Sequence, residues 1–357
     1  MIQFACYQFN VSKICNMLNK IKHIVRKSPK LRQAYQHQKI FRYTIKHKLG
    51  VGSRSGIGGF DLDRRISEIR RRYYVAYFID LRCNYRCSYC IQDDINRKEY
   101  DKTSVDHVIN YLKTEVKPRE TDLTIIGGEP TLSADFSYVV ESLCNDFYIT
   151  ITTNLSTRFY KDFEGFIKWA KKVKIRWNVS YHPEFMDIDL FINRVKKIQE
   201  AKIEMDQVSA VKLDLLSEAD RKKLESAGIG FTYQTNIGID EESGELLPKT
   251  DNHPDFNYER YQEMCGKQIK ETRKCRTVDY DGHARHLISS DGTIYNCHHL
   301  LYKEKHPIGH IDNGWPENIL DPIVCGEYGH CNPCDFRDME VLPMDKGFAK
   351  PVALVNV

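Results

Sequence analysis

Between Tyr73 and Gln234, short apolar runs rich in β-formers alternate with longer amphipathic ones. The apolar runs predict six strands, at Tyr73–Leu81, Asp122–Ile126, Tyr148–Thr152, Lys174–Ser180, Gln207–Leu213 and Gly230–Gln234. Helical patterns fall between them, near residues 104–116, 135–145, 161–172, 189–203 and 217–227. Six strands joined by five helices predict an α/β fold, a parallel sheet wrapped into a partial (β/α)6 TIM-like barrel over residues 61–262. In such a barrel a ligand site is expected at the ends of the strands, where the connecting loops converge.

The pattern is different ahead of the first strand. Apolar residues recur there at helical spacing with lysines and arginines between them: Ile14, Met17, Leu18, Ile21, Ile24 and Val25. This predicts a basic helix that ends near Ser28-Pro29. The glycine-rich residues 50–59 predict a flexible linker, because no strand precedes them and no Gly-Lys-Ser/Thr follows. Residues 61–72 predict a short charged helix that leads into the first strand.

Charge separates the N-terminal segment from the rest of the chain. The net charge is +4, but residues 1–60 hold twelve Lys and Arg and no Asp or Glu. That leaves 41 of the 53 basic side chains, against all 49 acidic ones, for the remaining residues, a balance of −8. The preferred interpretation of residues 1–60 is a helical extension packed on the main domain. The alternative is a helix that makes weak contact with an anionic membrane surface or guides a phosphorylated substrate.

Composition limits the compartment and the partners. Hydrophobic residues make up 41% of the chain, enough for a well-filled core, and no apolar run approaches the roughly 20 residues of a membrane span. The first residues lack the features of a secretory signal, and most of the twelve cysteines stand at metal-ligand spacings. We therefore expect a cytoplasmic protein, which would be peripheral to the membrane if the basic helix binds there. The acidic barrel portion has no recognisable nucleic-acid module, so a nucleic-acid partner is not expected.

The most specific chemical signal is a cysteine-rich stretch directly after the first strand. Cys83, Cys87 and Cys90 follow a CxxxCxxC spacing, and Tyr89 precedes the last of them. Three thiolates can hold three irons of a [4Fe–4S] cubane and leave the fourth iron open to a small molecule. The alternative is a structural zinc site, but zinc sites favour paired CxxC units and a fourth ligand.

This stretch resembles the cluster loop of the radical S-adenosylmethionine (SAM) superfamily. At the end of the second strand, Gly127-Gly128-Glu129-Pro130 resembles the segment that binds the SAM amino group in that superfamily. By the same resemblance, Asn154 and Ser180, at the ends of the third and fourth strands, are candidates for holding the SAM ribose and carboxylate. Tyr89 is a further cofactor-binding candidate. His182 is a weaker candidate for a substrate contact, and Lys212 and Gln234 lie near the ends of the fifth and sixth strands.

The last hundred residues hold a second group of cysteines. A turn at Asp291-Gly292-Thr293 predicts a hairpin, and Cys297 follows Gly292 after four residues. Together with the Cys331–Cys334 CxxC unit, this resembles the twitch form of the SPASM domain, which holds one auxiliary [4Fe–4S] cluster. The resemblance implies Cys275, Cys297, Cys331 and Cys334 as its ligands, with Cys325 as the alternative. The predicted domain covers residues 263–345, followed by a tail at 346–357. A zinc ribbon is the competing interpretation, and His298, His299, His306 and His310 receive no role.

The resemblance implies a radical SAM enzyme with one auxiliary cluster. Such an enzyme cleaves SAM reductively to a 5′-deoxyadenosyl radical, which abstracts a hydrogen atom from a substrate. The substrate class stays open between a small molecule, a carbohydrate derivative and a peptide, and an electron donor such as ferredoxin or flavodoxin is implied. One alternative is an activase that places a glycyl radical on another protein. The other is a non-catalytic metal-binding scaffold or electron-transfer protein.

Overall fold

The computed structural model describes residues 73–92, 103–116, 121–156, 162–211, 216–234, 238–239, 246–247, 257–277, 284–316, 321–336 and 339–346. All of them belong to one compact unit. The predicted basic extension at residues 1–60, its linker, the charged helix at 61–72 and Lys212 lie outside the described residues, as does the tail beyond Lys346. Within the described ranges, none of the helices combines the length and the apolar character that crossing a membrane requires.

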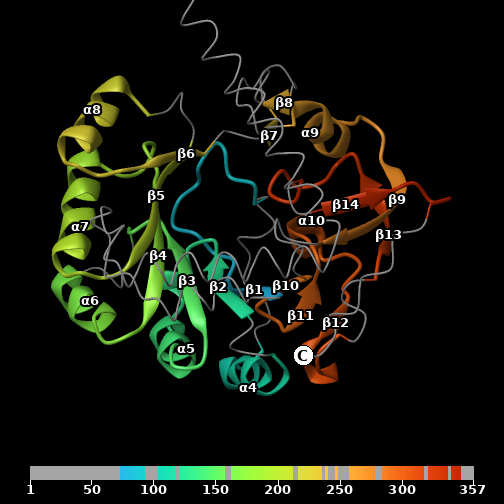
Figure 1. Cartoon of the computed structure of the whole chain (residues 1–357), viewed down its shortest axis with the longest axis horizontal. Coiled ribbons are helices and arrows are strands. Elements are labelled where there is room, and N and C mark those ends of the chain that lie inside the picture. Colours follow the sequence, from blue (N-terminus) through green and yellow to red (C-terminus); the bar gives the residue numbers. More distant parts are fainter. Residues whose placement is uncertain are drawn as a thin grey trace, which may run out of the picture. The chain divides into compact units, whose positions relative to one another are not determined.

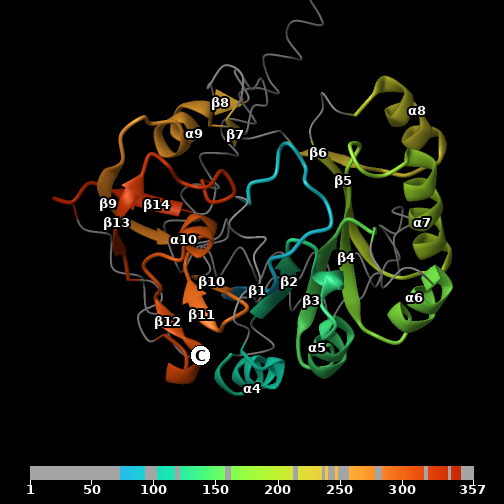
Figure 2. The same ribbon diagram turned by 180° about the vertical axis from the view of Figure 1, so that it is seen from behind.

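The alternation of strands and helices is confirmed. The strands are β1 (Tyr73–Asp80), β2 (Thr121–Gly127), β3 (Tyr148–Thr153), β4 (Ile175–Tyr181), β5 (Met205–Val211) and β6 (Thr232–Gln234). The helices between them are α4 (Val105–Glu115), α5 (Phe136–Leu143), α6 (Phe163–Ala170), α7 (Ile188–Glu200) and α8 (Glu218–Ser226). Each strand pairs in parallel with the next one along the chain. This is the mostly parallel sheet of a partial barrel, and α5 to α8 lie along its outer side (Figures 1 and 2).

The register of the sheet gives its two faces opposite character. Ile125, Ile151 and Trp177 align across β2, β3 and β4, and all three side chains are fully buried in the core that the helices cover. The neighbouring row is polar, because Thr124 aligns with Thr150 and Thr150 with Arg176. Side chains alternate between faces along a strand, so the polar row points away from the helices. On β3 and β4 the face that a barrel offers to ligands is therefore hydrophilic, whereas on β1 it carries the apolar Ala76 and Phe78.

The sheet continues beyond β1 with strands from the C-terminal part of the chain. Strand β10 (Ala284–Ile288) pairs in parallel with β1, and β11 (Thr293–Tyr295) and β12 (Gly309–His310) follow in antiparallel order. The predicted hairpin between β10 and β11 is confirmed, with Gly292 at a φ of +90°. The strands β10, β11 and β12 lie beyond the predicted domain boundary near residue 262 and still belong to the first sheet. That boundary stays a prediction.

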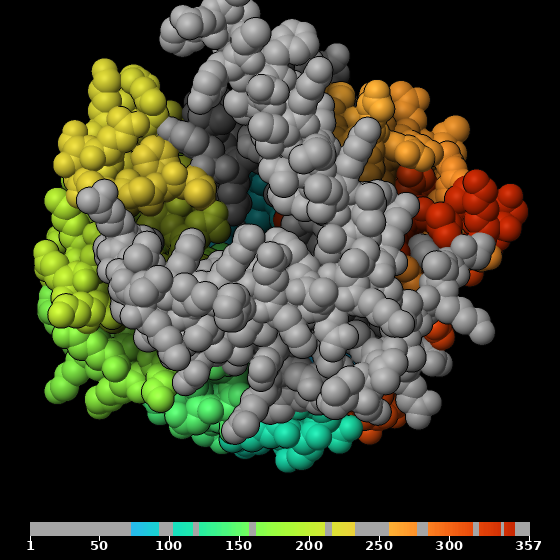
Figure 3. Space-filling view, viewed as in Figure 1, coloured from blue at the N-terminus to red at the C-terminus, as the bar shows by residue number. Residues whose placement is uncertain are grey.

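The remaining C-terminal elements build a second, smaller sheet. Strand β9 (Glu271–Thr277) lies between β13 (Ile323–Tyr328) and β14 (Met339–Leu342), and both neighbours are antiparallel to it. Helices α9 (Tyr258–Cys265) and α10 (His298–Lys303) pack in one apolar cluster with residues of this sheet. The two-residue strands β7 (Gly238–Ile239) and β8 (Leu246–Leu247) pair with each other. In the space-filling view, residues 121–234 (green to yellow) and residues 257–346 (orange to red) occupy different parts of the visible surface (Figure 3).

The apolar side chains form two cores. The larger one lies between the sheet and helices α4 to α8. The smaller one joins Phe78 and Leu81, at the end of β1, to residues of α9, α10 and the second sheet. Four cysteines are part of the smaller core: Cys265, Cys275, Cys297 and Cys325. The C-terminal cysteines are therefore built into the same packing that covers the end of β1.

Candidate functional site

The cysteine loop begins three residues after the end of β1. Cys83 and Cys87 are half-buried and Cys90 is exposed, and none of the three forms a disulfide. The Cys90 N–H donates to the Cys87 carbonyl (3.0 Å), and the Tyr85 N–H lies 3.4 Å from the Cys83 sulfur. These turns fold the loop back on itself at the carboxyl end of the strand, which is the position that the sequence predicts for a ligand site.

The three thiols influence one another electrostatically. Burial, together with negative charge on Cys90 and Cys83, raises the pKa of Cys87 to about 12, although the Tyr89 hydroxyl opposes this increase. A thiol with this pKa is protonated at neutral pH, and a bound metal would displace the proton. Within the described ranges, no three His, Cys, Asp or Glu side chains are arranged around one metal ion. A cubane does not require such convergence, because each thiolate binds a different iron. The donor set therefore fits an iron–sulfur cluster.

The turn at Gly127–Pro130 is attached to the backbone immediately before the cysteine loop. The Gly128 N–H donates to the Asp80 carbonyl (3.0 Å), and the Glu129 N–H donates to the Arg82 carbonyl (2.9 Å). A Cβ atom added to Gly127 would lie 1.9 Å from the Asp80 carbonyl oxygen, and one added to Gly128 would lie 2.5 Å from that of Arg82. The glycines therefore allow the ends of β1 and β2 to touch, a role that the sequence analysis did not predict.

The Glu129 carboxylate is buried and joins the end of β2 to the end of β3. One oxygen accepts hydrogen bonds from the Thr131 N–H (3.2 Å) and the Thr153 hydroxyl (2.8 Å), and the other accepts from the Asn154 N–H (2.8 Å). Burial raises the pKa of Glu129, and these hydrogen bonds oppose that increase. Pro130 begins the short helix η3 (Pro130–Leu132). Binding of the SAM amino group by Glu129 stays a prediction.

Asn154 and Ser180, the other two SAM-binding candidates, have different surroundings. The Asn154 side-chain amide donates to Asn84 of the cysteine loop (3.2 Å), and Asn84 donates to the Ser156 hydroxyl (2.7 Å). Asn154 is thus held against the loop. The Ser180 hydroxyl lies 3.1 Å from that of Ser209 on β5. The structure brings Asn154 to the cysteine loop, whereas it places Ser180 on the polar face of the sheet.

The loop between β4 and α7 also contacts the cysteine loop, which the sequence analysis did not predict. The Glu184 carboxylate accepts hydrogen bonds from the Ser88 hydroxyl (2.7 Å) and N–H (3.0 Å). The His182 ring lies parallel to that of Tyr89, and its Nδ1 is 2.9 Å from the Tyr89 hydroxyl. The only sequence signal was the position of His182 directly after a strand of the barrel.

Five cysteines were singled out in the C-terminal part, and four of them influence one another. The interaction with Cys325, burial, and charge on Cys331 and Cys297 raise the pKa of Cys275, and burial with charge on Asp335, Cys331 and Cys325 raises that of Cys297. Cys275 on β9 and Cys325 on β13 are diagonal neighbours on one face of paired strands, because Ile323 is opposite Cys275. The interaction between these two thiols lowers the pKa of Cys325 and raises that of Cys275, so Cys325 loses its proton first.

The fifth of these cysteines, Cys334, is exposed. It lies near Cys265, to which the sequence analysis gave no role. Cys265, at the end of α9, is buried, and its pKa is raised by burial and by charge on Cys331, Asp335 and Cys334. The sequence offered no spacing that linked Cys265 to the CxxC unit. Its position follows from the backbone, because the Cys331 N–H donates to the Met264 carbonyl (3.1 Å).

A buried polar cluster fixes the residues that follow Cys297 and Cys334. Asp335 accepts hydrogen bonds from the N–H groups of His298 and His299 (both 3.0 Å), and Arg285 lies against the same carboxylate (3.7 Å). The pKa of Asp335 is lowered, because the His298 and Arg285 charges and the hydrogen bonds outweigh the effect of burial. The cluster ties the start of α10 to the CxxC unit. His298 and His299 therefore have structural partners here.

The two cysteine groups are connected directly. The Asn332 side chain, inside the CxxC unit, donates to the carbonyl of Ile91, the residue after Cys90 (3.3 Å). At the other side of the loop, the Gln92 side chain donates to the Gly127 carbonyl (3.2 Å). One segment of the chain, Cys90–Gln92, thus contacts both the Gly127–Pro130 turn and the C-terminal cysteines.

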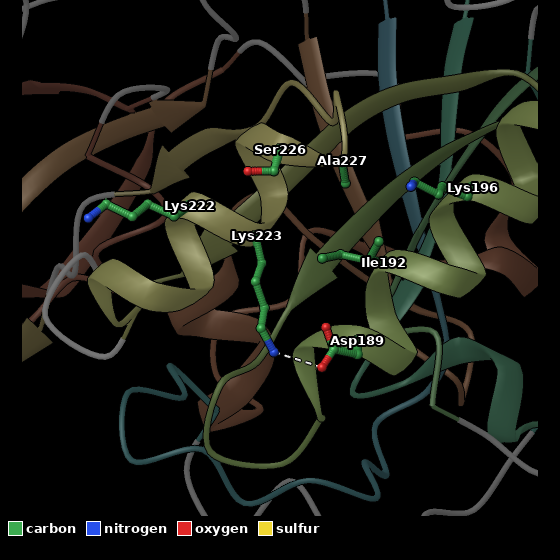
Figure 4. A pocket seen from close by; sticks show the side chains of 7 residues that line it. All are labelled: Asp189, Ile192, Lys196, Lys222, Lys223, Ser226 and Ala227. Atoms are coloured by element: carbon green, nitrogen blue, oxygen red, sulfur yellow. Dashed lines mark hydrogen bonds and ion pairs between the residues drawn. The ribbon is translucent and has the colours of Figure 1, made fainter.

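A groove between α7 and α8 lies apart from these residues. Its volume is about 400 Å³, and it is lined by Asp189, Ile192, Lys196, Lys222, Lys223, Ser226 and Ala227. Lys223 is paired with Asp189 across it (2.7 Å; Figure 4). None of the candidate site residues lines this groove, so it is not the site that the sequence predicts.

Comparison with known families agrees with the geometry of the cysteine loop. Residues 79–180 match the model of the Radical SAM superfamily. Residues 79–180 therefore form a radical SAM domain, and the enzymes of that superfamily use a [4Fe–4S] cluster and SAM.

Curated relatives match only part of their own length. A GTP 3′,8-cyclase of Haemophilus influenzae (strain 86-028NP) is 33% identical over 79 residues, which is 21% of this chain and 23% of that protein. A probable GTP 3′,8-cyclase of Methanococcus maripaludis is 29% identical over 75 residues, 20% of this chain and 25% of that protein. The similarity thus spans about a quarter of these relatives.

Two solved structures show a broader but weaker likeness. Native anSMEcpe with bound AdoMet and Cp18Cys peptide has a TM-score of 0.47 and 16% identity, and the alignment covers 70% of this chain and 79% of that one. Streptococcus suis SuiB bound to S-adenosylmethionine has a TM-score of 0.38 and 15% identity, with 80% of this chain and 77% of that one covered.

Proposed function

We propose that this chain is an enzyme that cleaves SAM reductively and removes a hydrogen atom from a polar substrate. The observation that carries the proposal is the attachment of the Gly127–Pro130 turn to the backbone immediately before the cysteine loop, at the carboxyl ends of β1 and β2. Cys83, Cys87 and Cys90 would hold the cluster. When bound, the cluster and SAM supply a 5′-deoxyadenosyl radical to the site.

The chain's own residues position the reactants and exclude water. The Gly127–Pro130 turn presents backbone polar groups beside the cysteine loop, and the buried Glu129 carboxylate holds that turn against the end of β3. Asn154 extends the same network to Asn84 of the loop. Because these groups are fixed by several hydrogen bonds each, little ordering is left to occur when SAM binds.

The polar face of the sheet supports a hydrophilic substrate. It carries Thr124, Thr150 and Arg176 in one row and Ser180 beside Ser209 nearer the strand ends. A lipid chain on this face would lie against polar side chains and offer them no hydrogen bond. The names of the relatives add a nucleoside triphosphate, GTP, to the candidates, and carbohydrate derivatives and peptides remain the others.

The C-terminal cysteines are proposed to hold one auxiliary [4Fe–4S] cluster. Its proposed ligands are Cys275, Cys297, Cys331 and Cys334, one for each iron of the cubane. Cys325 is the alternative ligand, on the strand β13 that pairs with the Cys275 strand β9. The thiol-only donor set is also compatible with zinc, so the metal must be measured.

The first experiment measures iron, sulfide and SAM cleavage in the anaerobically reconstituted full chain. We expect 5′-deoxyadenosine to form with a reductant and to be absent in Cys87→Ala, because one ligand of the cluster is lost. Cys144→Ala is the matched control, since Cys144 is a lone buried cysteine at the end of α5 and should leave cleavage unchanged. A wild-type chain that binds only zinc, or that does not cleave SAM, would refute the proposal.

The substrate class is tested by adding deuterated candidates to the active chain. Deuterium that appears in 5′-deoxyadenosine identifies the molecule whose hydrogen is abstracted. The arms are GTP, sugar nucleotides and peptides. Transfer from a membrane-embedded lipid but from none of the polar candidates would contradict the inference from the sheet's polar face.

A further inference from the structure

The loop between β4 and α7 holds the cysteine loop at several points. Glu184 binds both the N–H and the hydroxyl of Ser88. The Phe185 ring stacks on the Tyr85 ring, with centroids 4.9 Å apart and planes at 16°. Tyr85 in turn meets the His182 ring edge-on at 5.7 Å. His182 is therefore placed against the cysteines by its own ring contact and by the two residues Glu184 and Phe185 that follow it in the sequence.

Three polar atoms meet at the centre of this contact. His182 Nδ1 lies 3.3 Å from the Cys87 sulfur and 2.9 Å from the Tyr89 hydroxyl. The nearby Tyr89 hydroxyl lowers the pKa of the Cys87 thiol, in opposition to the effect of burial. The Tyr89 and His182 rings are parallel, with planes at 7° and centroids 6.0 Å apart. The stacked rings thus direct one hydroxyl and one ring nitrogen at the same sulfur.

The number of protons decides how these atoms are bonded once Cys87 is a metal-bound thiolate. The thiolate can only accept hydrogen bonds, the Tyr89 hydroxyl carries one proton, and a neutral imidazole carries one on either nitrogen. If the hydroxyl donated to Nδ1, the sulfur would receive neither proton. With the proton on Nδ1, both groups can donate toward the sulfur. Donation to a charged acceptor is the stronger interaction, so the second arrangement is favoured.

We propose that Tyr89 and His182 form a pair of hydrogen-bond donors to the Cys87 thiolate and thereby set the reduction potential of the cluster. This inference rests on the proposed function. Hydrogen bonds to the sulfurs of an iron–sulfur cluster stabilise its more negative, reduced state and so raise its potential. His182 is a positioning residue in this scheme, because it acts on the reaction through a ligand of the cluster.

The test is an EPR-monitored redox titration of the reconstituted full chain. His182→Phe keeps an aromatic ring against Tyr89 but removes the donor, and Tyr89→Phe removes the hydroxyl. Each should lower the potential, by about a tenfold change in the ratio of reduced to oxidised cluster, or about 59 mV for one electron. His182→Asn keeps an N–H near the position of Nδ1 and should restore the wild-type potential. Unchanged potentials in both phenylalanine variants would overturn the proposal.

The matched control is His107→Phe on α4, whose imidazole contacts Asp312 and not a cysteine, and which should leave the potential unchanged. If His182→Phe does not assemble a cluster, a second measurement tests whether His182 donates to the Cys87 thiolate. In the wild-type chain labelled with ¹⁵N-histidine, pulsed EPR of the reduced cluster should detect an imidazole coupling that His182→Asn abolishes. Absence of that coupling would refute the donor role. If the chain cleaves SAM but shows neither the shift in potential nor the imidazole coupling, only this inference is refuted. If the reconstituted chain holds no cluster, the proposed function is refuted as well.

Discussion

At the residue scale, the Gly127-Gly128 pair shows how a short motif acts through contact between strand ends. Gly127 lies so close to the Asp80 carbonyl that any side chain there would displace backbone. The next residue but one, Glu129, is held by hydrogen bonds from two other segments, Thr131 of η3 and Asn154 at the end of β3. The motif is thus a junction between three consecutive strands, and the same junction supports the cysteine loop.

Substitution of Gly127 by alanine tests this junction. The added Cβ meets backbone atoms that cannot move away cheaply, so Gly127→Ala should lower the free energy of unfolding by about 2–3 kcal/mol. Gly230→Ala is the control, because a Cβ there meets nothing within 4 Å and should change stability by less than about 0.5 kcal/mol. Chemical denaturation of both variants measures the difference. Equal stabilities would show that the contact relaxes without cost.

A second residue-scale prediction concerns His286 on β10. Its ring is fully buried against Trp315, and neither nitrogen has a hydrogen-bond partner among the described residues. Burial lowers its pKa to about 3. Because the unfolded chain takes up the proton first as pH falls, stability should be lost below about pH 6.5, by roughly 1 kcal/mol at pH 5.5. His286→Phe should remove this part of the pH dependence. Identical slopes for both proteins would contradict the prediction.

At the element scale, pairing of strands brings distant cysteines together. Antiparallel β9 and β13 make Cys275 and Cys325 diagonal neighbours, although fifty residues separate them in the sequence. The CxxC unit reaches the same region because the chain after β13 turns back to the end of α9, where Cys331 bonds to Met264. The arrangement of the auxiliary ligands therefore depends on these strands and on α9, and the spacing of the cysteines alone does not define it.

This arrangement predicts different outcomes for two cysteine substitutions. Cys325→Ser should retain the auxiliary iron, because Cys275 remains as the ligand and serine can still donate a hydrogen bond to it. Cys334→Ser should lose that iron while the cluster of Cys83, Cys87 and Cys90 is kept. Iron analysis and EPR of the two variants measure this. The reverse result would make Cys325 the ligand and Cys334 the surplus cysteine.

At the scale of the whole described unit, the barrel strands and the C-terminal part share both a sheet and a core. Strand β10 pairs with β1, and Phe78 and Leu81 at the end of β1 are covered by residues such as Leu300 and Tyr261. The Asn332–Ile91 hydrogen bond adds a polar contact at the same place. The cysteine loop is thus supported from both sides, by β2 and by the C-terminal elements.

Removal of the C-terminal part should therefore damage the barrel itself. A chain that ends at residue 262 loses the β10 partner of β1 and exposes the apolar side chains at the end of that strand. We expect it to lack a cooperative unfolding transition, as measured by circular dichroism against the full chain. A truncated chain that melts cooperatively at the wild-type temperature would show that the two parts fold independently.

Sequence patterns predicted the order of the barrel elements, because apolar periodicity is a local property of each segment. The six strands and five helices lie within a few residues of their expected positions. The position of the cysteine loop and the hairpin at Gly292 followed in the same way from neighbouring residues. Contacts between segments could be predicted less well from the sequence. The role of the β4–α7 loop and the position of Cys265 depend on packing between residues far apart in the chain.

By itself, then, the sequence determined the parallel α/β core and the cysteine-rich stretch that defines the chemical class. Spacing along the chain carries both kinds of information. Only the tertiary structure decided that Gly127-Gly128 packs on the backbone immediately before the cysteine loop, that β10 completes the sheet beside β1, and that His182 reaches Cys87. Each of these depends on strand register and on the direction of a side chain at a strand end, which nearby residues do not specify.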